Sequence, residues 1–303
     1  MTTDIESMAR TIHGVLRASP TSSPTHRALH AKGTTVGATF EASGALAPLT
    51  TASHLVDGSW PATVRFSHAS GDPQASDATP GARGMAVKLQ AADAAHDLVG
   101  VSLPAFFVRD GATFLELQAA RAPDPRTRAP DSDKMRAFVD AHPESLPAVQ
   151  AALEARIPAS YTSLAYNGLH TFFLVDPEGG RHPFRWSWVP VTGEAFLDGA
   201  VGDGFDLAGE LADRLATRPA VAFDLVIHLG EPADPTADPT AVWPERPTLV
   251  AGRLELSSPA DDVEPIIFDP TNVTTGVDLP EDDEILQLRR ITYGLSYAMR
   301  TSA

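Results

Sequence analysis

The sequence predicts an α+β fold in which an antiparallel sheet or barrel carries helices on its outside. Strand signals come in runs rather than alternating one-for-one with helices, which favours antiparallel pairing over a doubly wound parallel sheet. No glycine-rich phosphate loop follows a predicted strand, so nucleotide binding has no support. With 303 residues, of which 43% are hydrophobic, the chain can form one large domain or two modest ones with an ample core.

The strand predictions rest on alternation of apolar and polar side chains. In the first strand Val64 and Phe66 share one face, while Arg65 and Ser67 share the other. The sequence DPEGG separates two further alternating segments and predicts a hairpin around a glycine turn. The predicted strands are residues 62–67, 170–175, 182–189, 221–230 and 248–257.

Helical periodicity predicts five helices. The first has a stripe of apolar residues at helical spacing, including Ile5, Met8 and Ile12. The segment 231–247 contains five prolines in 17 residues, which is too many for a helix or an inner strand, so we expect a surface connection there. The predicted helices are residues 4–17, 131–142, 144–157, 206–218 and, at the C-terminus, about 282–300.

Composition excludes several classes of function. The formal net charge is −16 and no stretch is densely basic, which argues against nucleic acid or an anionic membrane as partner. The chain has no cysteine, so thiol catalysis and thiolate metal ligands are excluded. No apolar run reaches the roughly 18 residues of a membrane span, and the N-terminus lacks the layout of a signal peptide. We therefore expect a cytoplasmic protein.

The C-terminal helix has an unusual stripe for so acidic a chain. At about 100° per residue, Tyr293, Ser296 and Arg300 lie about 40°, −20° and 20° round from Arg289. Because Ile285 borders this stripe, the stripe faces inward in part. Burying guanidinium groups costs several kcal/mol unless anions meet them.

Two kinds of anionic partner can satisfy the stripe. The plainer one is a set of Asp or Glu side chains, of which the chain has 39. The other is a ligand with carboxylates, together with a tyrosine deprotonated against a metal. A phenol ionises at neutral pH only with such help from a cation or metal, and Arg289 stands one turn before Tyr293, where it can give it.

Six segments, taken together, resemble the haem catalases, in the order and at about the spacing of that family. The chain is short and looks like the minimal, catalase-related peroxidase branch. The resemblance implies a single haem domain over residues 1–303, with an eight-stranded antiparallel barrel, helices outside and haem b in a deep pocket. The segments are residues 27–44, 64–89, 97–110, 238–244, 268–289 and 286–300.

The resemblance implies two catalytic residues above the haem. His30, in LHAKG, matches the distal histidine, which takes a proton from the near oxygen of peroxide and returns it to the far one. Ser67, in RFS, matches the serine that orients this imidazole. Taken alone, a histidine in this chain is more often structural.

The resemblance also implies the groups below and around the haem. Tyr293 matches the tyrosinate ligand of the iron, and Arg289 the arginine that keeps it ionised. Asp283 and His170 match a chain of supporting residues behind that arginine, and a buried structural histidine stays open as the alternative for His170. The remaining matches are Arg27, Arg65 and Arg300, which bind the haem propionates, and Phe106 and Phe114, which lie near the haem face and channel or simply pack in the core.

The sequence departs from the family at one distal position. Val101 stands where catalases have an asparagine that binds peroxide with the distal histidine, and Ser102 follows it. Leu29 replaces a smaller β-branched residue and could narrow access. We therefore predict a peroxidase with weak catalase activity, which reduces hydrogen peroxide or an organic hydroperoxide with a small organic donor.

Two other functions stay open from the sequence. One is a haem enzyme that isomerises or cleaves organic hydroperoxides, and the other is a haem-binding protein without turnover. A carrier has no need of a placed acid–base group such as His30. By analogy with short family members we expect a homodimer.

Overall fold

Eight antiparallel strands close into a barrel in the computed structural model, which describes residues 2–124, 131–199, 201–202, 204–217, 220–259 and 265–302. The order around the ring is β1, β2, β3, β4, β5, β7, β8 and β9, and β9 pairs back with β1. This confirms the predicted barrel and its strand number. The ring strands are β1 Gly33–Ala42, β2 Ser59–His68, β3 Arg83–Gln90, β4 Ala95–Val101, β5 Tyr166–Asn167, β7 Arg181–Pro190, β8 Ala222–Leu229 and β9 Thr248–Pro259.

Two short strands extend the sheet beyond the ring. β6 (Phe172–Val175) pairs with β7 and forms the predicted hairpin, and β10 (Val277–Asp278) pairs with β6. Of all neighbouring strands in the ring, β4 and β5 are joined by the fewest residue pairs. There the register has one residue pair, Val101 with Asn167.

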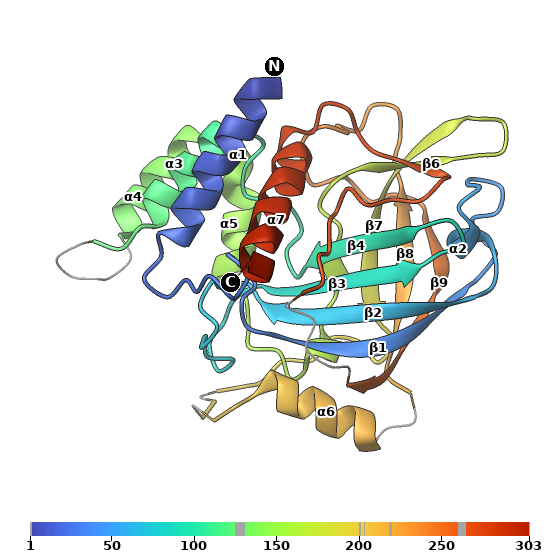
Figure 1. Cartoon of the computed structure of the whole chain (residues 1–303), viewed down its shortest axis with the longest axis horizontal. Coiled ribbons are helices and arrows are strands. Elements are labelled where there is room, and N and C mark those ends of the chain that lie inside the picture. Colours follow the sequence, from blue (N-terminus) through green and yellow to red (C-terminus); the bar gives the residue numbers. More distant parts are fainter. Residues whose placement is uncertain are drawn as a thin grey trace.

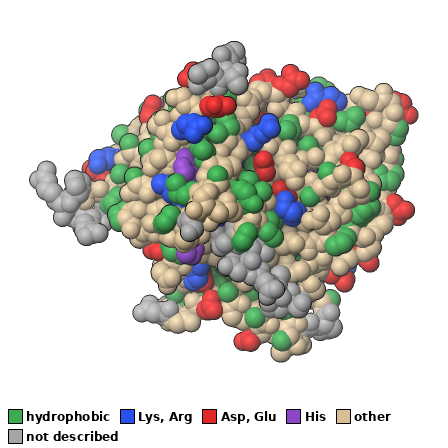
Figure 2. Space-filling model, in the orientation of Figure 1, with side chains coloured by type: hydrophobic (Ala, Val, Ile, Leu, Met, Phe, Trp, Pro, Cys, Tyr) green, Lys and Arg blue, Asp and Glu red, His purple; other side chains and the backbone are tan. Residues whose placement is uncertain are grey.

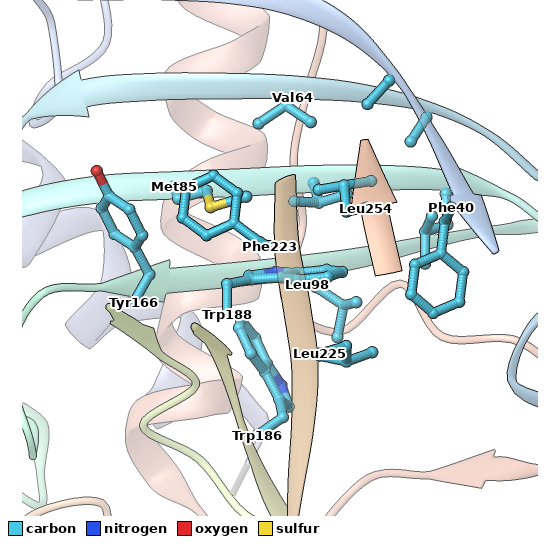
Figure 3. Packing of buried hydrophobic residues seen from close by; sticks show 14 of the residues in the cluster. Phe40, Val64, Met85, Leu98, Tyr166, Trp186, Trp188, Phe223, Leu225 and Leu254 are labelled. Atoms are coloured by element: carbon cyan, nitrogen blue, oxygen red, sulfur yellow. The ribbon is translucent and has the colours of Figure 1, made fainter. Parts of the chain in front are cut away.

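The barrel interior is the main hydrophobic core (Figure 3). Side chains on alternate strand positions point inward, so Val64 and Phe66 are fully buried, as are Trp188 and Phe223. The other face of β2 is covered too, because Arg65 and Ser67 are only 5% and 4% exposed. Elements outside the barrel must therefore bury that face.

Helices supply that cover. α1, α3, α4, α5 and α7 gather on one side of the barrel, and α6 lies below it (Figure 1). α1 and α7 pack side by side, and Ile12, Val108, Leu117 and Leu288 form part of a second apolar cluster, which we call the helical cluster. The helices are α1 Thr2–Arg17, α2 Ser53–Val56, α3 Gly111–Arg121, α4 Ser132–Ala141, α5 Leu146–Leu153, α6 Leu207–Thr217 and α7 Glu284–Ser302, with 3₁₀ turns at Pro143–Ser145 and Tyr161–Ser163.

Most helix predictions are confirmed, and one is corrected. The single helix predicted over residues 144–157 is a 3₁₀ turn followed by α5, which ends at Leu153. Pro147 lies in the first turn of α5, where its missing N–H costs nothing, so the regular helix begins directly before it. Residue 218, at the predicted end of α6, lies outside the described residues.

The surface is mixed in charge. On the face shown in Figure 2, acidic, basic and apolar side chains are interspersed over the described residues, and no continuous basic tract is seen there. None of the described helices is long and apolar enough to cross a membrane.

Candidate active site

A chain of hydrogen bonds links the segment between β5 and β6 to the tyrosine of α7. Nη2 of Arg289 donates to the hydroxyl oxygen of Tyr293 at 3.0 Å, and Nη1 of Arg289 lies 2.7 Å from Nε2 of His170. Nδ1 of His170 lies 2.6 Å from a carboxylate oxygen of Asp283. We call these four residues the proximal relay. His170 and Asp283 are 2% and 0% exposed, so the relay is anchored in a dry region.

The relay fixes the protonation of its histidine. The carboxylate of Asp283 can only accept, so Nδ1 of His170 donates to it, and Nε2 is left to accept from Arg289. His170 is therefore the neutral Nδ1–H tautomer, assigned from its partners. Its pKa is lowered, first by burial, although Asp283 acts in the opposite direction.

Local sequence places each member of the relay. Asp283 precedes α7, and its carboxylate accepts the backbone N–H of Leu286 at 2.9 Å, which caps the helix. Arg289 and Tyr293 are four residues apart and therefore share one face of α7. The ring of Phe106 lies 5.9 Å from the Arg289 guanidinium and 6.2 Å from the ring of His170, which limits how far either can move.

A second group lies on the outer face of the barrel. Nδ1 of His30 is 2.9 Å from the hydroxyl oxygen of Ser67 in β2. Gly84 in β3 pairs directly with Ser67, and a β-carbon there would lie 2.7 Å from Nδ1 of His30. Glycine at residue 84 is thus a requirement of the contact between His30 and Ser67.

The backbone around His30 is held from several sides. Among the non-glycine residues that the structure describes, His30 is the one with a positive φ, 57°. This conformation costs about 1–3 kcal/mol and must be stabilised by the surrounding contacts. Arg65 donates from Nη1 to the carbonyl of His30 at 3.0 Å and from Nη2 to that of Ala31 at 3.2 Å. The N–H of Ala31 donates to the carbonyl of Ser70 at 3.1 Å.

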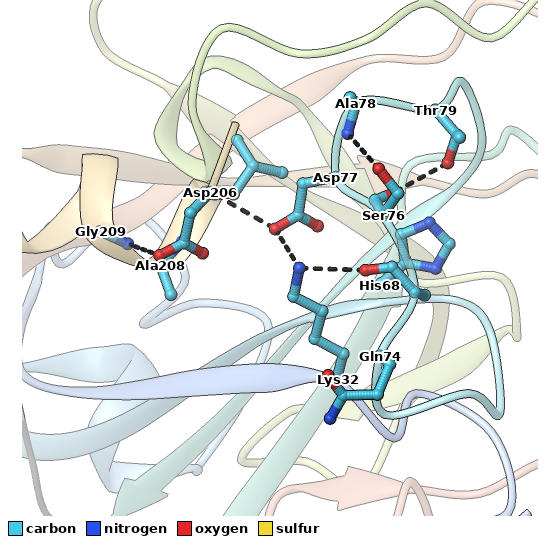
Figure 4. Close-up of polar contacts among 12 residues, drawn as sticks. Lys32, His68, Gln74, Ser76, Asp77, Ala78, Thr79, Asp206, Ala208 and Gly209 are labelled. Carbon is cyan, nitrogen blue, oxygen red and sulfur yellow. Dashed lines mark hydrogen bonds and ion pairs between the residues drawn. The ribbon is translucent and has the colours of Figure 1, made fainter. Parts of the chain in front are cut away.

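A buried ion pair extends this support to α6 (Figure 4). Nζ of Lys32 lies 2.7 Å from a carboxylate oxygen of Asp77, and the same oxygen accepts the backbone N–H of Leu207 at 3.2 Å. The Asp77 side chain is fully buried, and that of Lys32 is 27% exposed. Lys32 also donates to the carbonyl of Ala75 at 3.0 Å. We call Lys32 and Asp77 the distal brace, because they join the His30 segment to the first turn of α6.

Electrostatics connects the two groups. The pKa of His30 is lowered to about 3, first by burial and then by the charges of Arg65, Arg289, His68 and Arg27. The imidazole is therefore neutral at physiological pH and can accept a proton. Arg289 acts on His30 and also donates to Tyr293, so the four residues of the proximal relay lie within electrostatic reach of His30.

The three arginines expected at the propionates lie on two sides of the site. Arg27 and Arg300 converge on the carbonyl of Ile266, at 2.8 and 3.5 Å, and Arg65 lies under the His30 segment as described above. Arg300 also donates to the hydroxyl of Ser296, which accepts from Arg17 as well. Sequence reasoning missed Arg17.

Other predicted residues differ in their surroundings. Phe106 touches the proximal relay, whereas Phe114 lies in α3 and packs in the helical cluster. Ser102 uses its hydroxyl oxygen to accept the backbone N–H of Arg83 at 2.9 Å, which binds it to β3. Leu29, beside His30, is 41% exposed.

Val101 belongs to the same row of the sheet as the distal group. It pairs with Gly84 on one side and Asn167 on the other, and Gly84 pairs in turn with Ser67. Directly opposed residues share a face, so the Val101 side chain points to the face that carries the His30 contact. No cluster of three or more His, Asp or Glu able to hold a metal occurs in the part of the chain that the structure describes.

Comparisons with known proteins identify the family. The catalase family model matches residues 22–303. The chain is 34% identical over 295 residues to the catalase-related peroxidase of Mycolicibacterium paratuberculosis, covering 94% of this chain and 92% of that protein. It is 32% identical over 250 residues to the catalase-related peroxidase of Synechococcus elongatus, covering 80% and 73%. The longer catalase A of Emericella nidulans is 31% identical over 88% of this chain, which spans 39% of that protein. The chain therefore belongs to the catalase family.

Proposed function

We propose that this catalase-family chain is a haem-dependent peroxidase, which reduces hydrogen peroxide or an organic hydroperoxide with electrons from a small organic donor. The observation that carries the proposal is the contact between Arg289 and Tyr293 at 3.0 Å, backed by His170 and Asp283. A guanidinium that donates to a phenol oxygen stabilises the phenolate, which is a ligand for ferric haem.

The residues present fit haem b. Tyr293 would supply the oxygen ligand of the iron, and His30 would supply the acid–base group that acts on the bound peroxide. Arg27, Arg65 and Arg300 would meet the two propionates with bidentate groups. Arg27 and Arg300 both donate to the carbonyl of Ile266, at 2.8 and 3.5 Å, so their two guanidinium groups lie close together, as binding of a pair of carboxylates would require.

When bound, the haem would supply the electrons that break the peroxide O–O bond. His30 would move the proton. Its Nδ1 is engaged with Ser67, so Nε2 is the atom that takes the proton from the near oxygen and delivers it to the far one. A neutral imidazole is needed for the first of these transfers, and the lowered pKa of His30 provides it.

Val101 is the reason to expect that the catalase reaction of this enzyme is slow. Oxidation of a second peroxide molecule relies on peroxide held in place, and the Val101 side chain has no hydrogen-bonding group. Losing one oriented polar contact in such a site typically costs about 10²–10³-fold in rate. Proton transfer by His30 does not depend on that contact, so reduction of the first peroxide would survive.

The same apolar position favours one alternative, the isomerisation or cleavage of an organic hydroperoxide. Val101 would lie against an alkyl chain without leaving a polar group unpaired. A haem carrier without turnover is disfavoured, because it would not need the contact between His30 and Ser67. Cytoplasmic location and a homodimer remain predictions.

The haem proposal is tested by the visible spectrum. The purified protein loaded with haem should show a Soret band with high-spin ferric features, and Tyr293→Phe should lose or badly weaken it. Tyr297→Phe is the matched control, because Tyr297 is on the same helix one turn further and should keep the band. A protein that stays colourless after haem addition would end the proposal.

Products distinguish the activities. A peroxidase should oxidise a phenolic donor readily while releasing oxygen from hydrogen peroxide slowly. Rapid oxygen release would contradict the assignment of Val101. Conversion of an organic hydroperoxide into an isomer or fragments without a donor would favour the alternative.

A further inference from the structure

Arg185 in β7 is a buried cation outside the predicted site. Arg185 as a whole is 8% exposed, and Cζ of its guanidinium lies 4.6 Å from the centre of the Trp243 ring. Nε donates to the hydroxyl oxygen of Thr171 at 3.2 Å, Nη1 to the carbonyl of Ala241 at 2.6 Å and Nη2 to that of Asp238 at 3.1 Å. These acceptors are a hydroxyl and two backbone carbonyls, so the charge of Arg185 is balanced by something further away.

The contacts of Arg185 reach the proximal relay by two routes. Thr171 directly follows His170, so the bond from Nε holds the segment between β5 and β6 that carries the relay histidine. The second route uses the loop that Nη1 and Nη2 hold. In that loop the carbonyl of Pro239 accepts the backbone N–H of Phe106 at 2.9 Å, and the Phe106 ring packs on Arg289.

The charge balance of the region points the same way. Burial lowers the pKa of Arg185 to about 10, and among the charges that oppose this effect Asp283 comes first. The charges that face His170 are Asp283, which precedes α7, Arg289 from α7 and Arg185 from β7, and the uncharged ring of Phe106 lies beside them. His170 therefore has two cations and one anion near it. Both arginines oppose an added proton on His170, and Asp283 favours it.

We infer that Arg185 is a positioning residue of the proximal relay, which holds His170 in place and keeps it neutral so that its Nε2 accepts from Arg289. The inference deepens the proposed function and rests on it for its consequence at Tyr293, but its first step concerns the apoprotein alone. A protonated His170 has two N–H donors and no acceptor, so Arg289 would lose its partner. The guanidinium would then be less firmly aimed at the tyrosine.

The first test uses the apoprotein, with histidine labelled with ¹⁵N and followed by NMR across pH. In the wild type, His170 should carry its proton on Nδ1 through neutral pH. In Arg185→Met and Arg185→Gln, we expect its titration to move up by about one pH unit or more, a tenfold gain in proton affinity. Arg185→Lys keeps the charge and should leave the titration near that of the wild type.

Arg181→Met is the matched control. Arg181 lies on the same strand and stacks on Phe173 at 4.1 Å, but its ion pair is with Asp278 at the surface. It should leave His170 unchanged. If the neutral variants at residue 185 fold and titrate like the wild type, or if Arg185→Lys shifts His170 as far as they do, the inference is wrong. Arg185→Gln retains polar contacts and covers the case in which Arg185→Met does not fold.

The second test uses the haem-loaded protein. Arg185→Gln should shift the Soret band and weaken haem retention about tenfold, with Arg185→Lys closer to the wild type. A normal spectrum in Arg185→Gln with a displaced His170 titration would overturn the step from His170 to Tyr293. If the wild type itself binds no haem, the proposed function fails, and the NMR result still decides the role of Arg185.

Discussion

Substitution of Gly84 by alanine should separate the alignment of His30 from the fold. The new β-carbon would lie 2.7 Å from Nδ1 and 2.8 Å from Cε1 of His30, and 2.8 Å from the hydroxyl oxygen of Ser67. Ordinary contact begins at 3.4 Å, so the imidazole must retreat by about 0.7 Å in a packed interior. A displacement near 1 Å can cost about 10²-fold in rate.

The cost to stability should be modest by comparison. Overpacking by one methyl group typically destabilises a protein by about 1–3 kcal/mol. We therefore expect the haem-loaded Gly84→Ala protein to remain folded, and its second-order reaction with hydrogen peroxide, followed by stopped-flow absorbance, to slow by roughly 10²-fold. Gly14→Ala is the control, because a β-carbon at residue 14 of α1 meets nothing within 4 Å. A reaction of Gly84→Ala within twofold of the wild type would refute the idea that the close packing of His30 and Ser67 matters.

Three further outcomes are expected. Val101→Asn should raise oxygen release from hydrogen peroxide by about 10-fold or more, because it restores a polar contact on the face of the His30 group, whereas Val101→Leu should not. Lys32→Met should slow the peroxide reaction and cost about 1–3 kcal/mol in urea unfolding, and combining it with Asp77→Asn should cost less than the sum of the two, since they form one brace. Burial lowers the pKa of His54 from 6.5 to about 4, and His54 lies 2.9 Å from the buried His96. The unfolded imidazole takes up a proton below pH 6.5 that the folded one does not, so between pH 6.5 and pH 4 the wild type should lose about 3 kcal/mol more stability than His54→Gln, in which the other buried histidines still titrate; equal pH slopes would contradict this.

Periodicity predicted the elements that have one apolar face. The strands around Phe66 and Trp186 alternate clearly, because the barrel interior takes every second side chain. Other strands of the barrel were not predicted from the sequence. β4 is buried on both faces in its middle, at His96, Asp97 and Leu98, so its sequence looks neither like a half-exposed strand nor like a helix. β3 was missed although Met85, Val87 and Leu89 alternate with less buried residues.

The helix α3 was missed although its start carries a signal. Asp110 accepts the backbone N–H of Thr113 at 2.8 Å, which is the contact of an N-cap, and an aspartate before an apolar run could have indicated it. The strand number came only from the family resemblance. Closure depends on the pairing of β9 with β1 and of β7 with β8, and nothing local in the sequence specifies those long-range partners.

For the site, helical geometry alone brought Arg289, Tyr293 and Arg300 to one face of α7. It could not bring in His170, which lies 119 residues before Arg289. Gly84 and Asp77 could not be identified as site residues from the sequence, for another reason. The first acts by having no side chain, and the second acts through a lysine and a helix terminus that lies 130 residues further along the chain.

Besides its proposed effect on the reaction, residue 101 has a structural role, because it forms the single pair with Asn167. Val101 forms the one residue pair by which β4 meets β5, so a residue in the same row of the sheet as Ser67, the partner of His30, also keeps the barrel closed. Valine is favoured in strands and asparagine is not. A change that restores a peroxide-holding amide at this position should therefore loosen the pairing of β4 with β5, and amide hydrogen exchange should rise first in β5. The closure of the barrel and the reaction proposed for the site would then depend on the same side chain.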